Sequence, residues 1–409
     1  MPFDRLEQAL RAELDELDEL GTRKRDEPVI VQVLPPEGKR GPRVLLQGED
    51  QRPFLRMNCN GYLGLASHPE VIAAEESAAQ RYGAGPGSVR FISGTFFPHV
   101  RLEQRLATFH SREAAMIFSS AYAAVMGVLP PLVGEDTAVI SDELNHNCII
   151  SAMRMAQPAR KYVYPHLDMR GLAVALESAV GDGCRRVIVV TDGVFSMRGD
   201  HALLNEIVEL ARRFDHHFDE NVVVMADDSH GIGAFGQTGR GTEEVTGAQV
   251  DVLVATLGKA LGVNGGYVVG SQLLIDFLRE KSAFYIYSNP TTPAEAAAAT
   301  KSIDILDSDE GRADLAHLRG LTRRFEEGLR SLGLETIAGE HPIVPLLVRD
   351  SKRTRKIVER MREAGVIATG LAYPVVPRGE EEIRFQLSAE HTLADVDEVL
   401  DILADATGG

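Results

Sequence analysis

The segment Asn221-Val-Val-Val-Met-Ala-Asp-Asp-Ser-His-Gly-Ile-Gly233 decides the fold, together with Thr256-Leu-Gly-Lys-Ala-Leu-Gly262, which follows it closely. The first is a short apolar run that ends in two acids, and a run of this kind between turn-forming residues is typical of a strand buried in a parallel sheet. The second places Lys259 in a glycine-flanked turn directly after another apolar run. Both segments therefore predict polar groups at the carboxyl edge of an open α/β sheet, where such sheets bind ligands.

Six further apolar runs alternate with helical stretches on either side of the first segment. This alternation predicts a mostly parallel, seven-stranded sheet covered by helices on both faces. The expected strands lie within residues 114–120, 136–142, 159–165, 185–193, 221–228, 250–258 and 265–270.

The chain of 409 residues is longer than one compact core usually is, so we expect a large and a small domain. The large α/β domain is expected over residues 59–292. After it, long helical patterns and two apolar strands predict a smaller α+β domain over 293–409. Residues 1–58 are expected to form an N-terminal helix and a segment that packs with the small domain.

Charge and cysteine content exclude several classes of function. The formal net charge is −17, with 43 Lys and Arg against 60 Asp and Glu, which argues against nucleic-acid or anionic-membrane binding. No apolar run approaches the ~20 residues of a membrane span. The three cysteines, Cys59, Cys148 and Cys184, have neither an even count nor zinc-ligand spacing, and they fit a reducing cytoplasm. We expect no metal.

The N-terminus is too charged for a secretory signal but has the pattern of an amphipathic helix. Leucines recur at roughly helical spacing at positions 6, 10, 14, 17 and 20. This apolar stripe fits packing either on the body of the chain or on a partner subunit.

Lys259 is the candidate nucleophilic amine, because a partly desolvated lysine reacts more readily than one at its free pKa of ~10.4. Thr256, three residues earlier, would offer its hydroxyl to a phosphate. Asp227 would accept a charge-assisted hydrogen bond from a nitrogen in the ring of a bound ligand and so keep that nitrogen protonated. The adjacent Asp228 is its rival, but neighbouring strand residues face opposite sides of a sheet, so only one of the two acids is expected to face the ligand.

Three further segments supply an anion site and a flat group. Ser120, Ala121 and Tyr122 open a helix after an apolar run, and backbone N–H groups at a helix N-terminus bind phosphate. His146 in the segment DELNHN is the candidate for stacking on a ring. We expect His230 and Ser196 to form hydrogen bonds with a hydroxyl group on the ring of this ligand.

Arg384, in the expected strand IRFQLS, is the candidate clamp for a substrate carboxylate, because a guanidinium grips a carboxylate through two parallel hydrogen bonds. Asn60 is a second candidate contact. The amine, the acid, the phosphate donors and the flat group together meet the demands of pyridoxal 5′-phosphate (PLP).

Residues 231–236 satisfy the pattern G-x-G-x-x-G but do not indicate a dinucleotide site. That fingerprint needs a helix that begins inside the glycines, whereas QTGRGTEE follows here and lacks apolar periodicity.

The ordered motifs resemble those of the α-oxoamine synthases, a PLP-dependent family of fold type I. The resemblance runs from about residue 58 to the C-terminus and rests on NCNGYLGLASHPEVI, GSVRFISGT, ISDELNHNCII, VTDGVFSMRGD, DDSHGIGAFGQTGRGTEE, TLGKALG and IRFQLSAEHT. Within the family, GSVRFISGT, TDGVFSM, DDSH and SAEHT most resemble the glycine C-acetyltransferase (2-amino-3-ketobutyrate CoA ligase) branch.

The resemblance implies the residue roles given above and resolves the rivalry of the two acids toward Asp227. It further implies a homodimer with shared active sites, in which Ser288 and Asn289 reach the cofactor phosphate of the neighbouring subunit. The implied reaction joins an amino acid, glycine first, to an acyl-CoA thioester and releases CoA, with or without loss of carbon dioxide.

Departures from the family pattern leave the acyl donor open. Ala121 and Val125 stand where relatives often carry other residues, and Gly61 stands where Asn or Asp is usual. A different amino acid or a carrier-protein thioester is therefore an alternative. Another PLP reaction, such as that of an aminotransferase or aldolase, and a non-catalytic protein are the rival hypotheses.

Overall fold

The computed structural model of the chain describes residues 3–20, 23, 27–373 and 376–408. Its largest sheet has seven strands in the order β4-β10-β9-β8-β7-β5-β6. Only β10 runs antiparallel to its neighbours β4 and β9. The predicted mostly parallel, seven-stranded sheet is thus confirmed. The strands are β4 (Ala114–Phe118), β5 (Thr137–Asp142), β6 (Arg160–Tyr164), β7 (Arg186–Asp192), β8 (Val222–Asp227), β9 (Val252–Thr256) and β10 (Gly266–Gly270).

Most of the strands are apolar because the sheet is buried on both faces, whereas the edge strand β6 is largely exposed. Along β7, Val187 and Val189 pack into one core cluster, whereas Ile188 and Val190 pack into the other. One face is covered by α4 (Ala121–Leu132), α5 (Asn147–Ala156), α9 (Gln272–Lys281) and α10 (Ala283–Ile286). The opposite face is covered by α3 (Phe97–Phe109), α6 (Met169–Gly181) and α7 (Leu204–Phe214).

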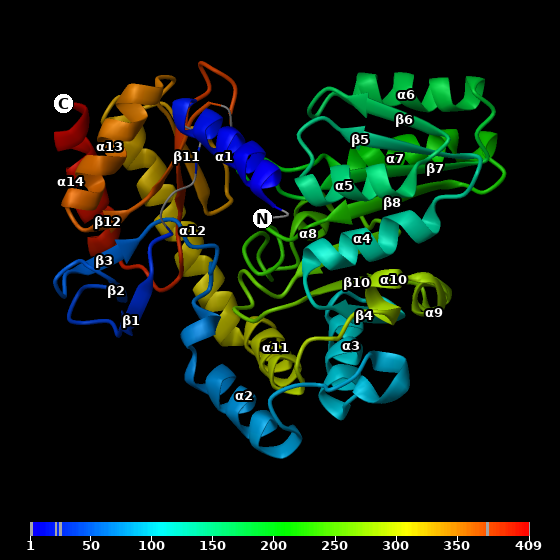
Figure 1. Ribbon diagram of the computed structural model, residues 1–409, viewed down its shortest axis with the longest axis horizontal. Helices are drawn as coiled ribbons and strands as arrows, with labels where there is room; N and C mark the ends of the chain where they lie inside the picture. Colours follow the sequence, from blue (N-terminus) through cyan, green and yellow to red (C-terminus); the bar gives the residue numbers. More distant parts are fainter. Residues whose placement is uncertain (1–2, 21–22, 24–26, 374–375, 409) are drawn as a thin grey trace.

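Two smaller sheets lie on the other side of the molecule (Figure 1). One has the order β11-β14-β13 and the other β1-β2-β3-β12. Their strands are β1 (Ile30–Leu34), β2 (Arg43–Leu46), β3 (Pro53–Arg56), β11 (Ile343–Leu347), β12 (Val366–Ile367), β13 (Thr369–Leu371) and β14 (Glu382–Gln386). Helices α13 (Ser351–Glu363) and α14 (Leu393–Thr407) flank them, and α12 (Asp309–Ser331) leads back toward α11 (Pro293–Leu306) and α2 (Pro69–Tyr82).

A short strand pairing is among the contacts that join the N-terminal strands to the C-terminal part of the chain. Val366 of β12 pairs with Leu55 of β3 in parallel register. The expected association of residues 1–58 with the small domain requires a contact of this kind. The bounds of the three domains stay a prediction.

Helix α1 (Asp4–Glu19) forms where the leucine pattern predicts it, but it buries none of its residues. Leu6 is 50% exposed and Leu10 is 49% exposed. The body of its own chain, which was one of the two expected packing partners, therefore does not cover the leucine stripe of α1. Within the described part of the chain, no helix is both long and apolar enough to span a membrane.

Candidate active site

A cavity of about 270 Å³ opens at the carboxyl edge of the large sheet. Its walls come from the segments that follow β4, β5, β7, β8 and β9, because parallel strands end at one edge. Nine of the site residues expected from the sequence line it: Ser120, Ala121, Tyr122, His146, Ser196, Asp227, His230, Thr256 and Lys259.

Lys259 reaches this cavity from a tight turn after β9. Its neighbours Leu257, Ala260 and Leu261 are buried and anchor the turn. Gly262 closes the turn with a φ of +70°, and a Cβ there would lie 2.3 Å from the backbone nitrogen of Ala66. Burial lowers the pKa of the Lys259 amine, against the opposing effect of nearby carboxylates. A larger share of neutral amine makes it a better nucleophile and base.

The structure places Asp227 in the cavity wall and turns Asp228 away from it. The Oδ1 atom of Asp227 accepts hydrogen bonds from the backbone N–H and the hydroxyl of Ser229, at 3.1 and 2.5 Å. Asp228 instead accepts the backbone N–H and the hydroxyl of Thr242, at 2.6 and 2.8 Å. Asp228 therefore holds a loop together, and Asp227 is the acid within reach of a ligand.

His146 is the N-cap residue of α5 and lies at the mouth of the cavity. Its backbone N–H donates to Oδ2 of Asp192, at 2.8 Å, and its Nδ1 lies 3.0 Å from the sulfur of Cys148. Partial burial and the nearby Lys259 lower its pKa more than Asp227 raises it. The ring, which lines the cavity, is thus neutral near pH 7.

The N-terminus of α4 lines one side of the cavity. The hydroxyl of Ser120 accepts the backbone N–H of Ala123 at 3.0 Å and so caps the helix. Gly266 presses against this turn, since a Cβ there would lie 2.3 Å from the nitrogen of Ala121. The hydroxyl of Thr256 is held by Gly258 N–H at 3.0 Å.

A chain of hydrogen bonds leads from the cavity to Arg384 on β14. The hydroxyl of Tyr62 lies 2.8 Å from Nδ1 of His230 and 3.3 Å from Oδ1 of Asn60. The same oxygen of Asn60 accepts a hydrogen bond from Nη2 of Arg384 at 3.0 Å. Burial lowers the pKa of His230 well below its usual range, so this ring is neutral. Arg384 and Asn60 form a pair beside the cavity rather than in its wall.

Ser288 and Asn289 do not line the cavity of their own chain. They follow α10 at the protein surface, where Asn289 is exposed. Their expected role in the neighbouring subunit stays a prediction.

Sequence reasoning missed four groups that line or brace the site: Cys148, Asp192, Ser229 and Tyr62. The motifs TDG and DDSH already contained Asp192 and Ser229 at the ends of their strands. Because Cys148 lies inside a helical pattern and Tyr62 is 168 residues from His230, no local signal identified them.

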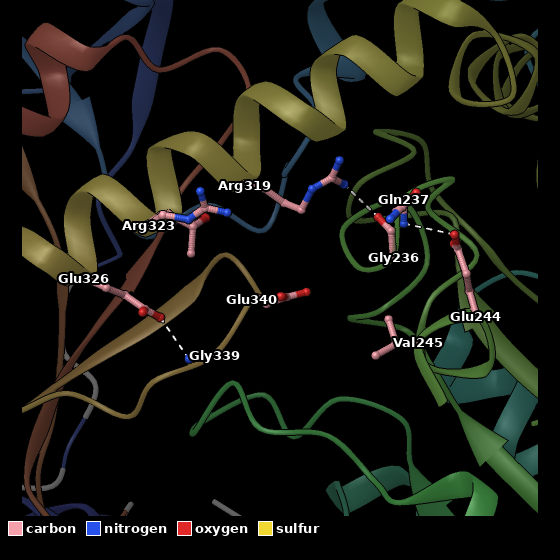
Figure 2. Close-up of a pocket in the computed structure, with 10 residues that line it drawn as sticks. Gly236, Gln237, Glu244, Val245, Arg319, Arg323, Glu326, Gly339 and Glu340 are labelled. Carbon is pink, nitrogen blue, oxygen red and sulfur yellow. Dashed lines mark hydrogen bonds between the residues drawn. The ribbon is translucent and has the colours of Figure 1, made fainter. Parts of the chain in front are cut away.

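A larger cavity of about 700 Å³ lies elsewhere, between α12 and the glycine-rich loop (Figure 2). Arg319 donates to the carbonyl oxygen of Gly236 at 3.0 Å, and Glu244 accepts the backbone N–H of Gln237 at 3.0 Å. None of the predicted site residues lines this cavity. The glycine pattern of residues 231–236 is followed only by the short α8 (Thr242–Thr246), which confirms that no helix begins inside this pattern.

The chain is similar to several known proteins. The profile of the family described as aminotransferase class I and II matches residues 52–403. The chain is 39% identical to 8-amino-7-oxononanoate synthase 1 of Bacillus velezensis, covering 97% of both proteins. It is 38% identical to the mitochondrial 2-amino-3-ketobutyrate coenzyme A ligase of Bos taurus, covering 97% of the chain and 91% of that protein.

Among solved structures, the chain is similar to serine palmitoyltransferase from S. paucimobilis with a bound PLP–myriocin aldimine. The TM-score is 0.86 at 27% identity, and the match covers 100% of this chain and 98% of the other.

Proposed function

The chain belongs to the aminotransferase class I and II family and, within it, to the PLP-dependent α-oxoamine synthases, and from this premise we propose that it condenses glycine with an acyl-CoA thioester. The reaction forms a carbon–carbon bond between the amino acid Cα and the acyl carbonyl and releases CoA. The product is a 2-amino-3-oxo acid, or an α-amino ketone where the carboxyl group leaves as carbon dioxide.

The donor set of the cavity fits PLP. Lys259 offers an amine of lowered pKa, Asp227 a carboxylate for the ring nitrogen, and His146 a flat neutral ring. Ala121 and Tyr122 would direct backbone N–H groups to the phosphate from the first turn of α4, with the hydroxyls of Ser120 and Thr256 beside them. His230 and Ser196 would face the ring hydroxyl.

When bound, PLP withdraws electrons from the Cα of the amino acid and makes its proton acidic. Lys259 is the base in the cavity wall that can take this proton, since its neutral form is favoured by burial. Asp227 would keep a proton on the ring nitrogen through a charge-assisted hydrogen bond. His146 would pack against the ring and shield one face from water.

We assign substrate carboxylate binding to Arg384 and Asn60. The guanidinium of Arg384 is half-buried, and it hydrogen-bonds the neutral side chains of Asn60 and Tyr62. A buried cation with no described acidic hydrogen-bond partner favours an incoming carboxylate. The bond chain through Tyr62 to His230 sets this clamp at a fixed position relative to the cofactor.

We further propose a homodimer in which each subunit completes the site of the other. Phe91, Ile92 and Phe97 are 66%, 69% and 66% exposed, and Tyr287 is 81% exposed. Arg90 lies 5.5 Å over the ring of Tyr285, so these segments are adjacent. Clustered exposed apolar side chains favour an interface. It lies next to Ser288 and Asn289, which would then contact the partner's cofactor phosphate. The leucine stripe of α1 fits the same partner.

The observation that carries the proposal is one cavity that holds a lysine amine of lowered pKa and a carboxylate, beside a carboxylate-binding arginine. The test mixes holoenzyme with glycine and acetyl-CoA and follows free thiol and product mass. Thiol release that Lys259→Ala abolishes is the expected result. Amino transfer to a 2-oxo acid without thiol release would instead support an aminotransferase.

The acyl donor is tested with the same assay, because two relatives of nearly equal identity carry names with different acyl groups. The panel contains acetyl-CoA, medium-chain acyl-CoAs and the corresponding carrier-protein thioesters, each with glycine, alanine and serine. We propose a cytoplasmic enzyme, which fits its three free cysteines.

A further inference from the structure

A second cavity adjoins the cofactor cavity at Ser196. It has a volume of about 290 Å³ and lies where the segment after β7 meets β11 and β14. Ser196 lines both cavities. A substrate group that points past Ser196 from the cofactor cavity therefore enters this space.

The wall of the second cavity is mainly apolar. Leu144, Phe195, Met197, Ile337 and Leu347 contribute to it. At roughly 30 Å³ per water-sized group, it has room for about nine such groups. This is the size of an aliphatic chain of six to eight carbons with one polar substituent, and it is far more than an acetyl group fills.

One buried acid interrupts this apolar wall. Glu382 is only 4% exposed, and its Oε1 atom has no hydrogen-bond partner among the described residues. The arginines of the wall are already engaged: Arg198 with Asp200 at 2.8 Å, and Arg349 with Glu335 at 3.0 Å. A buried oxygen without a partner is unfavourable, so the site favours a ligand that brings a hydrogen-bond donor.

Resting on the proposed function, we infer that this cavity binds the acyl chain of the thioester and that Glu382 accepts a hydrogen bond from a hydroxyl group on that chain. The substrate class is a medium-chain hydroxyacyl thioester. Burial raises the pKa of Glu382 to about 7, so above that pH its negative charge disfavours a terminal carboxylate. An ammonium group is disfavoured by Arg384, which lies two residues from Glu382 on the same face of β14.

The first test measures binding without catalysis. Holoenzyme is titrated calorimetrically with the unreactive thioethers S-ethyl-CoA and S-octyl-CoA. We expect S-octyl-CoA to bind at least tenfold more tightly. Ile337→Trp, or the milder Ile337→Phe, should reduce this advantage to less than threefold, whereas the matched control Val245→Trp, in the wall of the larger cavity, should keep it.

The second test uses S-octyl-CoA carrying one hydroxyl at each position from C3 to C8. The best of these should bind at least threefold more tightly than S-octyl-CoA. Glu382→Leu should reverse that order, while Glu382→Gln should retain part of it because the amide oxygen still accepts a hydrogen bond.

Two results would overturn the inference. One is equal affinity for S-ethyl- and S-octyl-CoA, or a chain-length advantage that Ile337→Trp leaves unchanged. The other is a hydroxyl series in which no member exceeds S-octyl-CoA. Thiol release from acetyl-CoA and glycine reports on the proposed function separately, so an active enzyme with no chain-length advantage rejects only the second cavity as the acyl site.

Discussion

The sulfur of Cys148 lies 3.5 Å from the Oδ2 atom of Asp227, at the base of the cofactor cavity. Burial strongly raises the pKa of this thiol, so it stays protonated and can donate to the carboxylate. Ser229 holds the other oxygen of Asp227. The acid is thereby fixed from two sides, and the same sulfur also contacts His146.

Replacing the thiol tests this positioning role. Cys148→Ala should lower kcat about three- to tenfold, because the lost hydrogen bond to a charged group is worth roughly 1 kcal/mol. Cys148→Ser should stay within about threefold of wild type, since a hydroxyl also donates. The matched control is Cys184→Ala, another buried cysteine outside the cavity. Steady-state kinetics and the pH dependence of the cofactor absorbance are the readouts, and a Cys148→Ala enzyme with unchanged absorbance would contradict the assignment.

The adjacent acids should respond differently to the same substitution. Asp227→Asn should leave the fold intact and lower kcat by two or more orders of magnitude, because an amide holds a proton on the ring nitrogen poorly. Asp228→Asn should chiefly destabilise the protein, by about 1–3 kcal/mol, since one of its two bonds from Thr242 meets an amide N–H₂ instead of an oxygen. Single-turnover kinetics and denaturant titration separate the two effects. Equal kinetic losses in both variants would remove the distinction.

The large sheet could be predicted from sequence because each strand is a short apolar run with its own boundaries. The strands β1, β2 and β3 were not predicted, although β1 (IVQVL) is itself a short apolar run, and β12 has only two residues. Its pairing with β3 joins Val366 to Leu55 across most of the chain, and no local pattern encodes a contact of that separation.

The same limit applies to the site. Lys259 and Asp227 end or follow apolar strands, so topology alone brings them to one edge. The choice between Asp227 and Asp228 depends on the directions of their side chains. The hydrogen bonds from Thr242 to Asp228 reveal that direction in the structure. Cys148 and Tyr62 contact site residues that lie on other segments of the chain. The spacing of residues along the sequence does not predict such contacts.

Arg384→Ala should mainly weaken amino-acid binding. Loss of a charge-assisted contact to the substrate carboxylate should raise KM for glycine about ten- to a hundredfold with a smaller change in kcat. Arg384→Lys should recover only part of this, because an ammonium cannot make two parallel hydrogen bonds. A suitable control is Arg324→Ala, which breaks an exposed ion pair with Asp397. Wild-type KM in Arg384→Ala would place the carboxylate site elsewhere.

His166 should make the stability of the protein depend on alkaline pH. Its ring lies between two acids, with Nδ1 3.0 Å from Asp142 and Nε2 3.2 Å from Asp200. Against the effect of burial, these carboxylates raise its pKa from 6.5 to about 9. A folded-state pKa above the unfolded value means that the stabilisation is complete below pH 6.5 and is lost as pH rises through about 9.

The expected loss is about 3–4 kcal/mol, because the rise of the pKa from 6.5 to about 9 is worth roughly 1.4 kcal/mol per pKa unit. We therefore expect the free energy of unfolding to fall between pH 6 and pH 10, and His166→Gln to remove most of this fall because glutamine keeps hydrogen bonds but carries no proton equilibrium. His216→Gln, at an exposed histidine, is the control and should keep the wild-type slope. Denaturant titration across this range measures it. If His166→Gln kept the wild-type slope, the proton on this ring would have no part in holding the segment of Asp200 against that of Asp142.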